Sequence, residues 1–251
     1  MPYDFRSPRL FVRAGLSEGA EVSPDQGQAN YLLNVMRLRA GDCVLVFNGL
    51  DGEWRARVEP FGKKGCRLVA EEKAREQTAP SDLHYLFAPL KHARLDYMVQ
   101  KAVEMGVGRL RPVLTQFTQV ARLNLERMEA NAIEAAEQCG ILAIPQIDAP
   151  RKLADMLDGW DGARRLIFCD EAAPPGGPVA ALTRLTSGPT ALLIGPEGGF
   201  SDEERADLLA RPYVTPLSLG PRILRADTAA VAALALVQAA LGGWGATDPA
   251  G

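Results

Sequence analysis

Hydrophobic and polar positions alternate in short runs over the first third of the chain. Turn residues at Asn48-Gly49 and Asp51-Gly52 separate these runs, which predict strands at 10–12, 43–47, 54–58 and 66–69. Between the first two strands, apolar residues of segment 26–37 recur at helical spacing and predict one helix. Short strands joined by glycine turns are typical of a small β-barrel or a curled sheet.

A second pattern begins after the polar segment 71–80, which ends in a proline and is typical of a linker. Apolar runs now alternate with amphipathic segments, and Ser201 with Glu204 forms a capping-box pattern at one helix start. The predicted strands are 83–88, 166–169, 191–194 and 214–219, and the predicted helices are 94–105, 122–138, 179–185, one beginning at Ser201, and 228–241. This α/β alternation predicts a mostly parallel sheet covered by helices on both faces. We therefore expect two domains, 1–74 and 75–251.

The composition narrows the possible classes of protein. Of 251 residues, 47% are hydrophobic and 24% are charged, which excludes global disorder. The formal net charge of −3 excludes a cationic coat over the whole chain, although basic residues can still gather on one face. Four cysteines without a CxxC pair, together with two histidines, argue against a zinc cluster. Because the sequence has neither a membrane-spanning apolar segment nor a signal-peptide core, we expect a cytoplasmic protein with no metal and no membrane partner.

Three loops that follow predicted strands form the candidate ligand site. In an open α/β sheet, ligands bind beyond the carboxyl ends of the strands. The loops are 170–177, 195–200 and 218–225. Gly195, Gly198 and Gly199 allow the second loop to approach a ligand closely with its backbone. Since neither a P-loop pattern nor a complete GxGxxG pattern occurs, the loops favour an adenosine over a phosphate.

Charged residues near these loops allow more than one role. Glu197 is a candidate general base or ligand acceptor, and equally a residue that anchors its own loop through backbone N–H groups. Asp170 and Glu171 are adjacent, so in an extended backbone they point to opposite sides and do not form a paired-acid site. Arginines lie beside aromatic residues near the N-terminus, and other basic residues surround the first strand-to-helix junction after the linker. This grouping favours either contact with RNA or an ordinary solvated face.

Several motifs taken together resemble a known family. In chain order they are Arg9-Leu10-Phe11-Val12, Tyr31-Leu32-Leu33-Asn34-Val35-Met36-Arg37-Leu38, Gln100-Lys101-Ala102-Val103-Glu104-Met105-Gly106-Val107 and Glu134-Ala135-Ala136-Glu137-Gln138. The two most specific are Ile194-Gly195-Pro196-Glu197-Gly198-Gly199-Phe200 and Leu219-Gly220-Pro221-Arg222-Ile223-Leu224-Arg225-Ala226-Asp227-Thr228-Ala229. On these motifs the chain resembles, nearly end to end, the ribosomal RNA small-subunit methyltransferase E family. These are the 16S rRNA uridine-N3 methyltransferases of the SPOUT superfamily.

The resemblance implies a PUA-like β-barrel for RNA binding at 1–74, a SPOUT methyltransferase domain with a trefoil knot at 75–251, and a homodimer. It implies S-adenosylmethionine (SAM) as the methyl donor and 16S rRNA, in an assembled or assembling small ribosomal subunit, as the substrate. The implied donor-binding residues are Asp170, Ile194, Gly195, Pro196, Glu197, Gly198, Gly199, Leu217, Ser218, Leu219, Gly220, Ile223, Leu224 and Thr228. The implied RNA-binding residues are Arg6, Arg9, Arg13, Arg37, Lys91, Arg94, Lys101 and Arg222. The candidate catalytic residues are Arg9, Glu197 and Arg225.

The chain departs from the family pattern at two places. Residues 141–143 carry no arginine where one is usual after Gly140, so one RNA contact is missing or supplied elsewhere. Asp227 stands where glutamate is common. The acceptor of the uridine N3 proton stays open among Glu197, Asp227 and solvent. The alternatives are a SPOUT methyltransferase acting on a ribose 2′-hydroxyl of tRNA or rRNA, a non-catalytic RNA-binding protein of the same fold, and an enzyme that acts on a small-molecule nucleotide.

Overall fold

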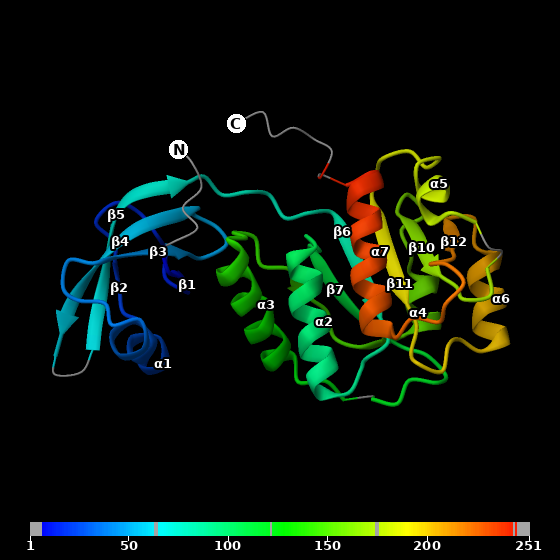
Figure 1. The fold of residues 1–251 in the computed structure, drawn as a ribbon, viewed down its shortest axis with the longest axis horizontal. Coiled ribbons are helices and arrows are strands. Elements are labelled where there is room, and N and C mark those ends of the chain that lie inside the picture. The colour runs from blue at the N-terminus through cyan, green and yellow to red at the C-terminus, as the bar shows by residue number, and fades with distance from the viewer. Residues whose placement is uncertain (1–6, 63–64, 121, 174–175, 243, 245–251) are drawn as a thin grey trace. The chain divides into compact units, whose positions relative to one another are not determined.

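The chain divides into two units, each with its own sheet (Figure 1). The structure is a computed structural model that describes residues 7–62, 65–120, 122–173, 176–242 and 244. The first unit contains Met1–Pro80 and Ile133–Ile144, and the second contains Ser81–Ala132 and Pro145–Gly251. Within the described part of the chain, every helix is too short or too polar to cross a membrane.

The first unit is built on a five-stranded sheet with the order β1-β3-β4-β5-β2. Its strands are β1 (Arg9–Phe11), β2 (Glu21–Val22), β3 (Cys43–Phe47), β4 (Glu53–Phe61) and β5 (Gly65–Arg75). β1 runs parallel to β3, and the other pairs are antiparallel. The four predicted strands are confirmed, whereas β2 was not predicted. Alternate residues of β4 and β5, such as Ala56 and Leu68, enter a core that also contains Leu32 from the helical segment.

Two predicted boundaries in this unit are wrong: the start of the linker and the end of the helix. β5 continues to Arg75, so the first half of the expected linker is strand, and the Arg75 guanidinium is paired with Glu53 of β4 at 2.8 Å. The helix expected over 26–37 consists of α1 (Gln26–Asn30) and one π-helical segment, Tyr31–Val35. It ends early because Arg37 has a φ of 58°, a left-handed conformation that a right-handed helix cannot contain.

A later stretch of the chain, residues 133–144, also belongs to the first unit. It includes the end of helix α3 (Leu125–Cys139), where the Glu137 carboxylate accepts a hydrogen bond from the Phe11 N–H at 2.7 Å. Burial raises the pKa of Glu137, and the Phe11 N–H opposes that shift. The Gly140 carbonyl accepts a hydrogen bond from Arg75 at 2.9 Å. The first unit is therefore discontinuous in sequence.

The second unit is built on a seven-stranded sheet in which all strand pairs are parallel. The order is β12-β10-β11-β6-β7-β8, and β9 pairs with β7. The strands are β6 (Leu83–Phe87), β7 (Arg109–Leu114), β8 (Gln146–Ile147), β9 (Arg151–Lys152), β10 (Arg165–Cys169), β11 (Thr190–Ile194) and β12 (Val214–Leu217). The predicted parallel sheet is confirmed. β7, β8 and β9 were not predicted, and β12 ends two residues earlier than expected.

Helices cover both faces of this sheet, as predicted. The helices after the linker, besides α3, are α2 (His92–Glu104), α4 (Leu153–Asp158), α5 (Pro178–Leu182), α6 (Asp202–Ala210) and α7 (Ala226–Leu241). α4 and α6 pack against one face, where Leu86, Phe168 and Leu193 are buried. α2 and α7 pack side by side over the other face, and the Tyr85 hydroxyl bonds to the Met98 sulfur there at 3.2 Å (Figure 1). The predicted capping box at the start of α6 is present.

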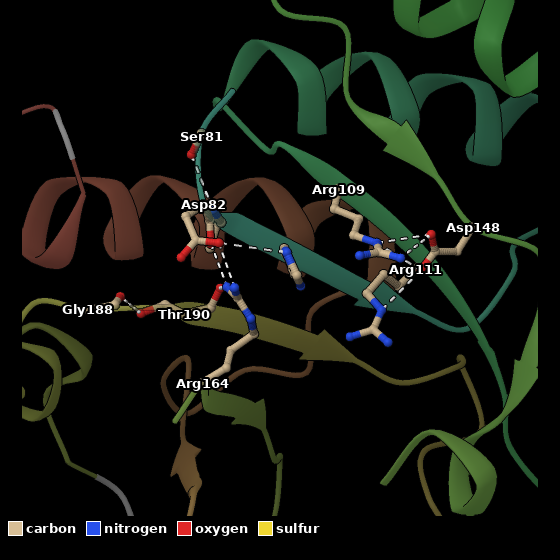
Figure 2. A network of polar contacts seen from close by, with 10 residues as sticks. Ser81, Asp82, Arg109, Arg111, Asp148, Arg164, Gly188 and Thr190 are labelled. Atoms are coloured by element: carbon tan, nitrogen blue, oxygen red, sulfur yellow. Dashed lines mark hydrogen bonds and ion pairs between the residues drawn. The ribbon is translucent and has the colours of Figure 1, made fainter. Parts of the chain in front are cut away.

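Arginine and aspartate side chains pair with one another along the amino ends of the central strands (Figure 2). Arg109 and Arg111 of β7 both donate to the Asp148 carboxylate, at 3.0 and 3.2 Å from their Nε atoms. Arg164, just before β10, donates to the Asp82 carboxylate at 2.6 Å. His84 lies in the same region, and burial together with the nearby arginines lowers its pKa from 6.5 to about 4. This edge of the sheet is filled by polar side chains.

Candidate functional site

The carboxyl ends of β10, β11 and β12 surround a cavity of about 440 Å³ in the second unit. These strands are neighbours in the sheet, so the three loops predicted as the ligand site lie around one space. The volume falls within the range of about 300–1,000 Å³ that small-molecule sites occupy. The observed edge is the one at which open parallel sheets bind ligands.

The loop after β11 packs close to its neighbours because it contains three glycines, of which Gly195 and Gly199 matter most for its shape. A Cβ at Gly195 would lie 2.4 Å from the Phe200 ring, which itself packs edge-on against Phe168. Gly199 has a φ of 70°, which favours glycine, and its N–H closes a turn on the Pro196 carbonyl at 2.9 Å. The loop therefore presents backbone groups, rather than side chains, along one wall of the cavity.

The loop after β12 forms another wall, with a larger share of apolar side chains. Leu217, Leu219, Ile223 and Leu224 line the cavity, and the Ile223 side chain is 93% exposed. Apolar walls combined with backbone N–H and C=O groups suit the flat, uncharged face and the polar edge of a purine. This composition fits an adenosine-containing ligand.

Asp170, predicted to bind the donor, is buried at the end of β10 and holds an ion pair. Its carboxylate accepts three hydrogen bonds from the Arg205 guanidinium of α6, at 2.9 to 3.1 Å, and a fourth from the Ala172 N–H at 3.0 Å. Asp170 still lines the cavity, where it fixes α6 against the strand end. Beside it, burial raises the pKa of the Cys169 thiol, which is therefore neutral.

Most predicted donor-binding residues lie around this cavity. All of them line it except Ser218 and Thr228. Ser218 lies next to lining residues, with its hydroxyl 3.4 Å from the Gly220 N–H, and the Thr228 N–H donates to Asp227. The cavity also includes residues that were not named as donor-binding: Glu171, Phe200 and Pro221, which lie within the predicted loops, and Cys169, Ala226 and Ala229, which lie outside them. Phe200 ends the motif 194–200, and this position was the sequence signal that could have identified it.

The three candidate catalytic residues have different surroundings. Arg225 lines the cavity with its side chain 67% exposed, and its Nε lies 4.0 Å from an Asp227 oxygen. Glu197 also lines the cavity, and its carboxylate is paired with the Arg94 guanidinium of α2. Arg9, in the first unit, is buried with its Nε 3.0 Å from the buried Glu53 carboxylate. That enclosed ion pair gives Arg9 a structural environment, in contrast to the exposed position that was expected.

The predicted RNA-binding residues occupy several places. Arg13 and Arg37 are exposed on the first unit, and the Arg13 guanidinium lies over the Phe11 ring. Lys101 is paired with Glu104 on α2, and Arg222 lines the donor cavity. Arg6 lies outside the described residues.

Lys91 and Arg94 line a second cavity of about 310 Å³ at the same edge of the sheet. It lies beyond β6, β7 and β11, and it includes Phe117, whose side chain is 43% exposed. Pro196 and Glu197 of the β11 loop line both cavities. The two spaces are therefore neighbours, with one loop in common.

Comparison with known families assigns most of the second unit to a family of RNA methyltransferases. The family described as "RNA methyltransferase domain" matches residues 77–238, which include both cavities. The chain belongs to the RNA methyltransferase family. A further match, to the "RNA methyltransferase PUA domain", covers residues 24–71 of the first unit.

Related RNA methyltransferases extend over nearly the whole chain. The ribosomal RNA small subunit methyltransferase E of Rickettsia conorii is 28% identical, and the match covers 92% of this chain and 94% of that protein. The crystal structure of the Neisseria gonorrhoeae enzyme of that name, bound to SAM, has a TM-score of 0.82 at 26% identity and covers 95% and 100% of the two chains. A Legionella pneumophila methyltransferase in complex with SAM has a TM-score of 0.80 at 30% identity, with 94% and 98% covered. These matches confirm the predicted fold class and family, whereas the knot stays a prediction.

Proposed function

We propose that this protein transfers a methyl group from SAM to N3 of one uridine in 16S rRNA. The observation that carries this proposal is the cavity of about 440 Å³ enclosed by the three strand-end loops. Its apolar walls and glycine backbone fit an adenosine, and relatives of similar length are named for small-subunit rRNA or were crystallised with SAM. The bound donor supplies a methyl group made electrophilic by a positively charged sulfur.

The backbone of the β11 and β12 loops is the proposed cradle of the donor. Gly195 and Gly199 allow the backbone to approach the donor closely, while Leu217, Leu219 and Ile223 line the apolar part of the cavity. A side chain at Gly195 would collide with Phe200, so the shape of the cradle depends on glycine at that position. Holding donor and acceptor in line lowers the barrier by about 7–11 kcal/mol in well-oriented reactions.

Charged residues at the rim are proposed to act on the uridine. N3 lies on the Watson–Crick edge, so the base must be unpaired or flipped out of a helix before it can react. The exposed Arg225 guanidinium stabilises negative charge that develops on the uracil oxygens as N3 loses its proton. Glu197 and Asp227 are the two carboxylates that could accept this proton. Glu197 lines the donor cavity, whereas Asp227 is not among its lining residues. Arg9 is assigned a structural role in the first unit.

The remaining predictions form part of the same proposal. A PUA-like domain at 1–74 binds RNA through its exposed basic residues, among them Arg13 and Arg37, and the domain at 75–251 is knotted and catalytic. The protein acts as a homodimer in the cytoplasm on an assembled or assembling small subunit. The PUA-domain match over 24–71 supports the RNA-binding role.

The decisive experiment is mass-spectrometric mapping of 16S rRNA from a strain that lacks the protein. We expect loss of a single N3-methyluridine and its return when the gene is restored. Loss of a ribose 2′-O-methyl group would instead support the alternative SPOUT reaction. Calorimetry with SAM provides a second readout, because donor binding without methyl transfer to small subunits or free rRNA would support a non-catalytic RNA-binding protein.

A further inference from the structure

The second cavity lies at the carboxyl ends of β6, β7 and β11, and most of its lining residues are outside the donor cavity. It lies next to the donor cavity because β11 is the strand between β10 and β6. The β11 loop, through Pro196 and Glu197, lines both spaces. A molecule in the second cavity would therefore contact the same loop as the donor.

Phe117 gives this cavity a flat aromatic surface. It follows β7, its side chain is 43% exposed, and its Cβ lies 3.3 Å from where a Cβ of Gly198 would stand. The absence of a side chain at Gly198 lets the β11 loop pack directly against Phe117. An exposed aromatic ring beside a methyl-donor site is suited to stacking with an unpaired base, because every base presents a π-face.

Basic residues give the same cavity a preference for a nucleotide over a free base. Lys91 is exposed in the loop after β6, and Arg94 lies one helical turn further along the chain. The Arg94 guanidinium is paired with Glu197, so it fixes the position of the shared loop. Lys91 is therefore the cation placed to meet a phosphate, and apolar residues such as Leu90 and Val120 line the remaining wall.

We propose that the second cavity is the acceptor subsite, which binds the flipped-out uridine nucleotide with its base stacked on Phe117 and its phosphate at Lys91. Arg94 is a positioning residue that holds Glu197 between the two subsites. The proposal rests on the proposed function, because it names the place of the RNA nucleotide that receives the methyl group.

The test separates acceptor binding from donor binding with Phe117→Ala. We expect the efficiency of methyl transfer (kcat/KM) to small subunits isolated from a strain lacking the protein to fall about 10-fold or more, the size of one base–aromatic stack. The affinity for SAM in calorimetry should stay within about 2-fold of wild type, since Phe117 is outside the donor cavity. Phe117→Tyr should restore transfer, because it keeps the ring. Leu209→Ala, which shortens another exposed apolar residue outside both cavities, is the matched control.

A binding measurement tests the phosphate contact without any methyl transfer. For fluorescein-labelled decauridine RNA followed by anisotropy, Lys91→Ala should lower affinity and reduce the slope of log K against log salt by about one. Lys152→Ala removes an exposed lysine outside both cavities and should leave the slope unchanged. If both Phe117→Ala and Lys91→Ala match wild type, the acceptor subsite is wrong. If wild type itself methylates no RNA, the proposed function fails, and the decauridine measurement still decides whether this cavity binds a nucleotide.

Discussion

The two edges of the second unit's sheet are built in opposite ways. At the amino ends of the strands, arginine and aspartate side chains fill the space and pair with one another (Figure 2). At the carboxyl ends, glycines replace side chains, and two cavities remain between the loops. Charged groups at the first edge are satisfied within the protein, whereas backbone groups at the second can meet a ligand. The binding site in this unit therefore depends on the absence of side chains from the strand-end loops.

The largest effect is expected when one methyl group is added to the glycine loop at the carboxyl ends of the strands. Gly195→Ala places a Cβ 2.4 Å from the Phe200 ring, so the β11 loop must move, and we expect SAM affinity to fall about 100-fold, or about 2.7 kcal/mol. Gly188→Ala, in the loop before the same strand, meets nothing within 4 Å and should bind SAM normally. Calorimetric titration of both variants checks the difference. Equal affinities would show that the glycine cradle does not shape the donor site.

Removing one charge from the amino edge should affect stability without affecting the donor. Asp148→Asn leaves Arg109 and Arg111, which both donate to this half-buried carboxylate, without their counter-charge. We expect unfolding free energy in urea to fall by about 2 kcal/mol, below the range for fully buried pairs, with SAM affinity unchanged. Asp158→Asn, at a carboxylate that is 74% exposed, is the control and should change stability much less. A large loss of donor affinity in Asp148→Asn would mean that the two edges are coupled.

The smallest expected effect is a dependence of stability on pH that comes from His84. Its pKa is about 4 in the folded protein and 6.5 in the unfolded chain, so between these values only the unfolded state binds the proton. Stability therefore falls as pH is lowered from 6.5 toward 4, and His84 accounts for about 1 kcal/mol between pH 7.5 and 5.5. His84→Gln should show a flatter profile in urea unfolding over that interval. Parallel profiles for the two proteins would contradict the lowered pKa.

The sequence predicted the parallel sheet and the donor cavity because their signals are local. Runs of buried β-branched and aliphatic residues mark β10 and β11, and the glycines of the β11 loop lie within a few residues of one another. β7 was missed because Arg109, Arg111 and Pro112 interrupt its apolar pattern, although its other residues are buried or half-buried. A strand whose arginines pair with an aspartate elsewhere in the chain does not have the apolar pattern of a core strand.

Features that depend on residues far apart in the chain could not be predicted from the sequence. Arg9 resembles an exposed basic residue until Glu53, 44 positions away, is brought beside it in the sheet. Arg37 gave no sign that it would adopt a left-handed backbone and end its helix. The second cavity requires β6 to lie between β11 and β7, an order that the alternation of strands and helices does not determine.

The loop shared by the two cavities has a thermodynamic consequence. If the donor changes the conformation of Pro196 and Glu197, it changes the affinity of the neighbouring cavity for its own ligand. By reciprocity, a nucleotide there must change SAM affinity by the same factor. Cooperativity between the two substrates can thus arise within a single short turn, without motion of any helix or strand.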